Sequence, residues 1–392
     1  MKLQPVALNE RVYAIDLMRG FALLGILLIN MLTFHSPFSY IDPYKWFNGA
    51  WDTEVFSVLD IFVQASFYPL FSMLFGYGLA MQFMKAQKYQ RPFMPIAVKR
   101  LLILLAFGII HAFLIWYGDI LITYAITGFF LLGFIRLKPA WLLGLAAAIY
   151  VIPQLFLLSL MFVAVSIDSN IYTGMQEVQS SLAAYPSGTF AEIFSQRFDD
   201  WMHSNNPASY FYLIITILPF LMAGAAAAKM QLIERAAHYR KLWISLAVGG
   251  LVLGLLLKST PLLIDNNYAF QYLQDIFGGP LVAIGYAALI ALMAQSNGLR
   301  KLLSPLAKAG RMSLTTYIGQ SLIATLIFYS YGFGLYGQVD VLTGTWIALG
   351  IFAIQVIFAE LWMSKFGQGP LEYLSRRLTY GRNLEKSNNS KR

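Results

Sequence analysis

The stretch that decides the fold is IAVKRLLILLAFGIIHAFLIWYGDILITYAITGFFLLGFI, residues 96–135. It contains two strongly apolar segments, and the short turn Tyr117-Gly118 separates them. A membrane-spanning helix needs about 20 predominantly apolar residues. The pattern therefore predicts two helices that cross a membrane as a hairpin, at 96–117 and 119–136.

Three ionisable residues interrupt this hairpin, namely Arg100, His111 and Asp119. A helix rises about 1.5 Å per residue, so His111 lies about 16 Å along the axis from Arg100. If Arg100 marks one edge of a hydrocarbon layer of ~30 Å, His111 lies near its centre. An ionisable side chain at that depth is costly and suggests a functional site.

The composition of the whole chain agrees with a membrane protein. Of 392 residues, 58% are hydrophobic and only 12% are charged, whereas soluble domains are about 45–50% apolar and about 25% charged. We therefore predict an all-α polytopic protein in which residues 1–392 form a single integral membrane domain. The chain has no cysteine, which excludes disulfide and thiolate chemistry.

About ten transmembrane helices are expected, and the first, an uncleaved helix, begins near residue 13. Their expected ranges are 13–34, 55–84, 96–117, 119–136, 139–165, 207–229, 241–258, 267–295, 311–331 and 343–365. With the N-terminus in the cytoplasm, 24 Lys and Arg residues fall on the cytoplasmic side and 3 on the other, with Arg19 inside a span. This asymmetry satisfies the positive-inside rule and places both termini in the cytoplasm.

The same asymmetry accounts for the net charge of +9 without nucleic acid as a partner. The side expected to be cytoplasmic includes Lys2, Arg11 and a basic tail at 366–392. The opposite side carries one long outer loop, 166–206. Within it, FAEIFSQRFDDWM (190–202) aligns its aromatic residues along one side and predicts an amphipathic helix.

Polar residues recur on single faces of several expected spans, although lipid cannot satisfy them. In the first span Asp16, Arg19 and Asn30 fall within about 60° of arc at 100° per residue. Asp16 and Arg19 are three residues apart and can pair. One interpretation is a helix-end ion pair that only sets topology; the other is a cationic site facing the bundle interior.

Two further spans repeat the pattern. The second span carries Asp60, Gln64, Tyr68 and Ser72 at steps of four residues, and the ninth carries Ser313, Thr316, Tyr317 and Gln320 along one face. Such stripes face protein or a water-filled cavity. Simple hydrogen bonding between helices is the alternative explanation.

Several classes of site are absent from the sequence. The four histidines do not have the spacing of a metal site, and no HExxH motif or phosphate-binding glycine loop is present. We therefore expect no metal.

Six stretches resemble the YeiB-type family of bacterial membrane proteins. They are RVYAIDLMRGFALLGILLINM (11–31), FSMLFGYGLA (71–80), GIIHAFLIWYGDILITYAITG (108–128), GRMSLTTYIGQSL (310–322), YGFGLYG (331–337) and GPLEYLSRRLTYG (369–381). That family is grouped with transmembrane acyltransferases, alongside heparan-glucosaminide acetyltransferase and the type-three acyltransferases. The resemblance implies helices around a central cavity in the bacterial inner membrane, surrounded by its lipids.

The resemblance also implies a reaction, in which an acyl group passes from cytoplasmic acyl-CoA, expected to be acetyl-CoA, to a cell-envelope glycan or lipid-linked sugar. Arg19 and Arg100, with Asp16, are the residues expected to bind the donor. His111 is the expected general base, because histidine is the side chain most often used for that role, and Asp119 would orient its ring. Candidates for binding substrate or stabilising the thioester oxyanion are Asn30, Gln64, Tyr68, Tyr317 and Gln320.

Two other functions stay open at this point. The first is a transporter or exporter in which His111 and Asp119 relay protons. The second is a non-catalytic membrane module that senses a lipid or docks a partner. The sequence also leaves open the acyl group, the acceptor, the oligomeric state, and direct transfer as against an acyl-histidine intermediate.

Overall fold

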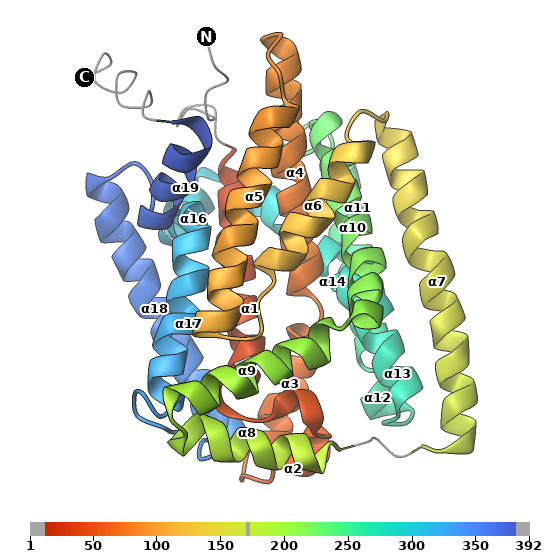
Figure 1. The fold of residues 1–392 in the computed structure, drawn as a ribbon. Helices are drawn as coiled ribbons and strands as arrows, with labels where there is room; N and C mark the ends of the chain where they lie inside the picture. The colour runs from red at the N-terminus through yellow and green to blue at the C-terminus, as the bar shows by residue number, and fades with distance from the viewer. Residues whose placement is uncertain (1–11, 170–172, 382–392) are drawn as a thin grey trace.

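A computed structural model describes residues 12–169 and 173–381, and all secondary structure in these ranges is helical (Figure 1). The prediction of an all-helical multi-pass membrane protein is confirmed. Lys2, Arg11, residues 382–392 of the predicted tail and residues 170–172 of the predicted outer loop lie outside the described ranges.

Within the described residues, eight segments are long and apolar enough to cross a membrane. They are Tyr13–His35 (α1), Asp52–Lys88 (α3 and α4), Met94–Ile115 (α5 and η3), Pro139–Ile167 (α7), Pro207–Lys229 (α10), Arg240–Lys258 (α11), Tyr268–Met293 (α13, η4 and α14) and Val341–Lys365 (α18). Two shorter apolar helices, α6 (Leu121–Phe134) and α17 (Ser313–Phe328), occupy the places of the fourth and ninth expected spans. The count of ten crossings stays a prediction.

The other bounds complete the element order. They are η2 (Phe38–Tyr40), α2 (Pro43–Trp46), α3 (Asp52–Phe62), α4 (Phe67–Lys88), α5 (Met94–Ile110), η3 (His111–Ile115), α8 (Met175–Ser187), α9 (Phe190–Asn205), α12 (Thr260–Leu263), α13 (Tyr268–Leu273), η4 (Gln274–Gly278), α14 (Gly279–Met293), α15 (Asn297–Leu302), α16 (Ser304–Arg311) and α19 (Pro370–Tyr380). Both η3 and η4 are π-helical turns.

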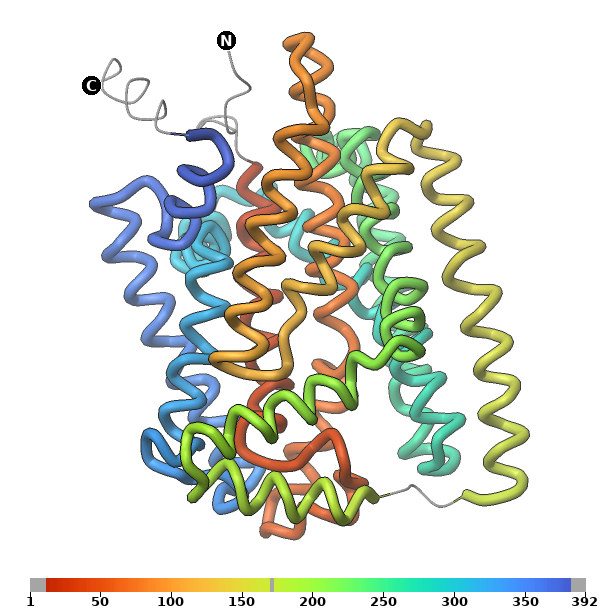
Figure 2. Tube along the Cα trace, in the orientation of Figure 1, coloured from red at the N-terminus to blue at the C-terminus, as the bar shows by residue number. Residues whose placement is uncertain are grey.

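The bundle has two chemically different ends. The basic connections 85–100, 136–138 and 229–241 gather at one end together with α19, and α2, α8 and α9 lie at the other (Figures 1 and 2). We call these the basic end and the cap end. Helix α7 lies at the edge of the bundle (Figure 2), and only 11% of its apolar window is buried, as expected of a helix surrounded by lipid. The basic end is the one predicted to face the cytoplasm.

Glycines let the central helices α4 and α10 pack backbone to backbone. A Cβ atom added at Gly76 would lie 2.0 Å from the carbonyl oxygen of Leu221, and one at Gly224 would lie 1.9 Å from that of Met73. Small residues are typical of such contacts in membranes because helix association there depends on close packing.

The close contact of α4 with α10 predicts a large effect of a single substitution. Gly224→Val should lower the free energy of unfolding by about 1–3 kcal/mol or more, because the added methyl groups force the two backbones apart. Thermal unfolding in detergent measures this change. Gly249→Val is the matched control, since an added Cβ there meets no atom within 4 Å. Equal melting temperatures for the two variants would contradict the packing argument.

The second expected span is broken where the sequence predicted a continuous helix. α3 ends at Phe62, α4 begins at Phe67, and Ala65 between them adopts a positive φ of 56°. Pro69 lies in the first turn of α4, where its missing N–H costs little. The break separates the two halves of the predicted polar stripe.

Candidate functional site

The imidazole of His111 lies at the centre of a buried hydrogen-bonded chain. Its Nδ1 atom is 2.9 Å from Oδ1 of Asp119, and its Nε2 atom is 2.8 Å from Oγ of Ser321. The side chains of His111 and Asp119 are 0% exposed, and Ser321 is 1% exposed. The structure therefore brings the two predicted catalytic residues together and adds a hydroxyl group.

The α5–α6 hairpin positions this pair. α5 ends at Ile110, and the π-helical turn η3 begins with His111 itself. π-Helical turns are frequent at functional sites. Oδ2 of Asp119 accepts a hydrogen bond of 2.8 Å from the N–H of Ile122 in the first turn of α6. Gly108 allows the close approach, because a Cβ there would lie 2.7 Å from that same nitrogen.

The hydrogen-bond pattern assigns a role to each atom. The Asp119 carboxylate accepts from Nδ1–H, which leaves Nε2 to accept from the hydroxyl of Ser321. This is the order of groups in a Ser-His-Asp triad, in which the imidazole removes the proton of the hydroxyl.

Ser321 did not emerge from the sequence. It lies four residues after Tyr317 and so shares the polar face of the ninth expected span, and this spacing could have identified it.

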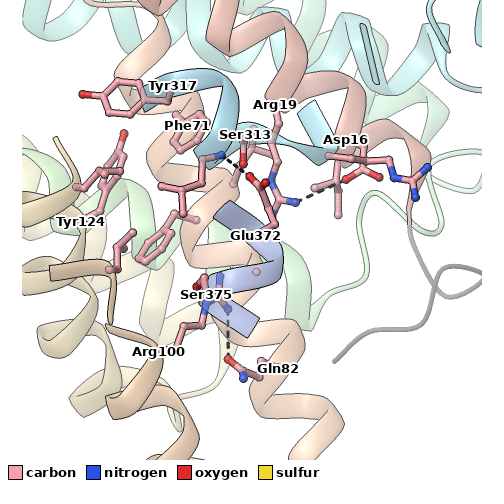
Figure 3. A pocket seen from close by; sticks show the side chains of 18 of the residues that line it. Asp16, Arg19, Phe71, Gln82, Arg100, Tyr124, Ser313, Tyr317, Glu372 and Ser375 are labelled. Atoms are coloured by element: carbon pink, nitrogen blue, oxygen red, sulfur yellow. Dashed lines mark hydrogen bonds and ion pairs between the residues drawn. The ribbon is translucent and has the colours of Figure 1, made fainter. Parts of the chain in front are cut away.

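A cavity of about 310 Å³ extends inward from the basic end and stops beside this chain (Figure 3). Its wall carries five cationic side chains and two acidic ones, which are Arg19, Lys85, Arg100, Arg311, Arg376, Asp16 and Glu372. The deeper wall is apolar and includes Phe71, Leu74, Phe75 and Leu104. The cavity thus has a cationic entrance and an apolar interior.

Tyr317 connects the cavity to the buried chain. It lines the cavity, as do Ile120 and Leu121, whereas His111, Asp119 and Ser321 do not. The centre of its ring is 5.0 Å from that of the imidazole, and its hydroxyl donates to the carbonyl of Gly118 over 3.3 Å. A molecule that fills the cavity therefore stops one side chain short of His111.

All three predicted donor-binding residues line the cavity. Nη1 of Arg19 is 3.6 Å from Oδ1 of Asp16, and both residues are labelled in Figure 3. Arg100 donates from Nη1 to Oε1 of Gln82 over 3.3 Å, and its guanidinium lies 5.9 Å from the centre of the Phe75 ring. These contacts orient the two arginines but leave them on the wall of the cavity.

Helix α19 supplies cavity residues that sequence reasoning assigned only to a basic tail. Its side chains Glu372, Ser375, Arg376, Thr379 and Tyr380 form one wall. The carboxylate of Glu372 holds α19 against α17. It accepts one hydrogen bond from the N–H of Leu314 over 2.7 Å and another from the hydroxyl of Thr315 over 2.6 Å.

Four of the predicted substrate or oxyanion residues lie away from this cavity. Gln320 is buried and donates to the carbonyl of Leu23 over 3.4 Å. Asn30 does not line the cavity. The break before α4 moves Gln64 and Tyr68 elsewhere: the Gln64 carbonyl accepts from Lys258, and the Tyr68 ring packs 6.2 Å from that of Phe220. Of this group only Tyr317 reaches the site.

Comparison with known proteins places the chain among proteins described as uncharacterized or of unknown function. Residues 227–382 match a family described as a protein of unknown function, DUF418. The chain is 35% identical to the uncharacterized protein YxaH of Bacillus subtilis over 96% of each chain. It is 29% identical to the uncharacterized protein YeiB of Escherichia coli, over 94% of this chain and 96% of YeiB. It is also 29% identical to an uncharacterized 39.9 kDa protein of Bacillus acidopullulyticus, over 97% of each chain.

Proposed function

This chain belongs to the YeiB family of multi-pass membrane proteins, and we propose that it is a transmembrane acyltransferase of the bacterial plasma membrane. In this proposal the acyl group of a cytoplasmic acyl-CoA enters at the basic end and leaves on a cell-envelope glycan or lipid-linked sugar. The observation that carries it is the Ser321–His111–Asp119 chain at the inner end of a cation-lined cavity.

The cavity has the chemistry that an acyl-CoA requires. Coenzyme A carries phosphate groups at one end and a long, weakly polar arm at the other. Guanidinium groups bind phosphate oxygens through charge-assisted hydrogen bonds, and Arg19, Arg100 and Arg376 lie where the cavity is cationic. The apolar wall formed by Phe71, Phe75 and their neighbours suits the arm. The thioester then lies against Tyr317.

The buried chain can then carry out the transfer in two steps. The first step requires the Tyr317 ring, which separates the cavity from the buried chain, to move aside. Oγ of Ser321 then attacks the thioester carbonyl while Nε2 of His111 takes the hydroxyl proton, and that proton passes to the departing sulfur as the C–S bond breaks. An acceptor hydroxyl next attacks the serine ester, gives its proton to His111, and Ser321 recovers it. Asp119 holds the ring in the required tautomer and stabilises the imidazolium.

The proposal is tested with purified protein in proteoliposomes that receive acyl-CoA labelled in the acyl group. Label should leave CoA and appear on an envelope extract supplied as acceptor. Absence of transfer from every donor and extract, with folded protein, would refute the proposal.

The cationic entrance predicts a specific loss of donor affinity. Arg100→Gln should raise the KM for acyl-CoA about 10- to 100-fold, because a charge-assisted hydrogen bond contributes about 1.5–3 kcal/mol. The turnover number should change little. The neighbouring Lys99→Gln is the matched control, since Lys99 is exposed and does not line the cavity. If both variants behave alike, the entrance does not bind the donor.

A second function has one observation in its favour. Lys258 is fully buried, with Nζ 3.1 Å from Oδ1 of Asp275 and 2.9 Å from the Gln64 carbonyl at the break in the second span. Buried charges at interrupted helices are typical of transporters. Substrate flux driven by a pH gradient in liposomes without acyl-CoA would support that alternative.

A further inference from the structure

Helix α9 turns its polar face toward the protein and its aromatic face outward. Phe190, Phe194 and Phe198 are 57%, 40% and 45% exposed, whereas Arg197 and Asp200 are buried. Figure 1 shows α9 lying across the bundle close to η3, at the cap end. The aromatic face suits a lipid surface. The inward polar face therefore needs an explanation of its own.

The guanidinium of Arg197 is the unusual group on this face. The residue is 0% exposed, and its Nη1 donates to the carbonyl of Phe113 in η3 over 2.8 Å. Its Nε and Nη2 atoms are buried and have no hydrogen-bond partner. Within residues 12–169 and 173–381, no carboxylate lies within 4.0 Å of it.

Asp200, one turn further along α9, does not neutralise this charge. Its carboxylate accepts hydrogen bonds from Tyr40 over 2.8 Å, Tyr185 over 2.5 Å and Gln196 over 2.7 Å. Burial raises the pKa of the Asp200 carboxyl above its ordinary value, although these hydrogen bonds oppose the shift. The aspartate is engaged with neutral donors and not with the guanidinium.

Two other buried donors, the Tyr329 hydroxyl close to Arg197 and the Trp116 indole just after η3, also lack hydrogen-bond partners among the described residues. The hydroxyl of Tyr329 has none, and this group interacts electrostatically with Arg197. The indole Nε1 of Trp116 has none either, and the Trp116 ring lies 6.3 Å from the imidazole of His111. A set of unused donors thus extends from the cap end toward the buried serine and histidine.

A buried guanidinium without a carboxylate partner is strongly unfavourable. Its unused Nε and Nη2 donors, with the Tyr329 hydroxyl, match the oxygens of an anion. We propose that Arg197, with the Tyr329 hydroxyl, binds an oxyanion, a phosphate or carboxylate, carried by the acceptor. The term acceptor rests on the proposed function; the anion site itself does not. The acceptor class is then a phosphate-linked or acidic glycan, or a lipid with an anionic headgroup.

The test is an anion-binding measurement that needs no acyl transfer. The full-length protein in phosphatidylcholine nanodiscs is titrated with pyrophosphate, inorganic phosphate or glucuronate, and its thermal unfolding is followed. A second set of nanodiscs contains phosphatidylglycerol, which separates a lipid headgroup from a soluble anion. Wild type is compared with Arg197→Met, Arg197→Lys and the exposed cation variant Lys45→Gln, which lies at the same end.

We expect at least one anion to stabilise wild type and Lys45→Gln alike. In Arg197→Met the apparent affinity for that anion should fall at least ~10-fold, and its melting temperature without anion should equal or exceed that of wild type, because an unpaired charge is removed. The anion should still raise the melting temperature of Arg197→Lys, but by less than it raises that of wild type.

A merely structural Arg197 gives other results. Arg197→Met would then unfold at a lower temperature without anion, or would keep the full wild-type response, and no anion or anionic lipid would act through this residue. Any of these results overturns the inference. If wild type binds the anion through Arg197 yet transfers no acyl group, the proposed function fails and the anion site stands.

Discussion

Replacing His111 by alanine is expected to lower the rate of acyl transfer by about 10³- to 10⁶-fold, which is the loss found when the base of a Ser-His-Asp triad is removed. The imidazole alone contacts both Ser321, at 2.8 Å, and Asp119, at 2.9 Å. Without it, the serine proton has no acceptor and the departing thiolate has no donor. Proteoliposomes with labelled acyl-CoA measure the effect directly.

Two further variants define what the histidine does. His111→Gln keeps a polar side chain of similar size but cannot take up a proton, so it should be as inactive as the alanine variant. Asp119→Asn keeps the contact with the ring but favours the wrong tautomer, and should cost up to about 10⁴-fold. Wild-type rates in His111→Ala, with a melting temperature near that of wild type, would remove His111 from the mechanism.

Replacing Ser321 by alanine is expected to abolish a covalent acyl-enzyme. With labelled acyl-CoA and no acceptor, wild type should retain label on the peptide that contains Ser321, and Ser321→Ala should retain none. Its steady-state transfer should fall about 10³-fold or more, because the nucleophile is lost. Mass spectrometry of the trapped protein and steady-state rates are the two measurements.

The serine experiment also decides the chemical route that the sequence left open. Label on His111 would indicate an acyl-histidine intermediate. The alternative result is that wild type retains no label and that the transfer rate of Ser321→Ala stays within about tenfold of the wild-type rate. This result would mean that the acceptor attacks the thioester directly and that Ser321 only positions the imidazole. Thr325→Ala is the matched control, since Thr325 lies one turn further along α17 and its hydroxyl donates a hydrogen bond to the carbonyl of Leu322 in the same helix.

Hydropathy and helical geometry were sufficient to predict the fold class and to single out two of the three residues of the buried chain. Long apolar windows identify membrane helices because the cost of exposing polar groups to lipid adds up over a whole segment. The pairing of His111 with Asp119 followed from a short hairpin, whose register depends only on nearby residues. The family resemblance implied that Arg19 and Arg100 bind one donor, and both residues line the same cavity.

The residues that could not be predicted depend on contacts between distant parts of the chain. Ser321 is 210 positions from His111, and α19 reaches the cavity because Glu372 bonds to the start of α17. Gln64 lies away from the cavity for another reason: a stripe at steps of four residues assumes an unbroken helix, and α3 ends at Phe62. Arg197 was counted only as a charge on the outer loop.

Glu372 has one more consequence, for the way a polyanion must lie in the cavity. The start of a helix ordinarily attracts phosphate through its free N–H groups. At α17 the N–H groups of Leu314 and Thr315 are already occupied by the Glu372 carboxylate. A nucleotide entering there meets a negative charge and is displaced toward the guanidinium groups across the opening. Neutralising this single carboxylate would free the N–H groups of Leu314 and Thr315 to bind the incoming phosphates at a second, unproductive position.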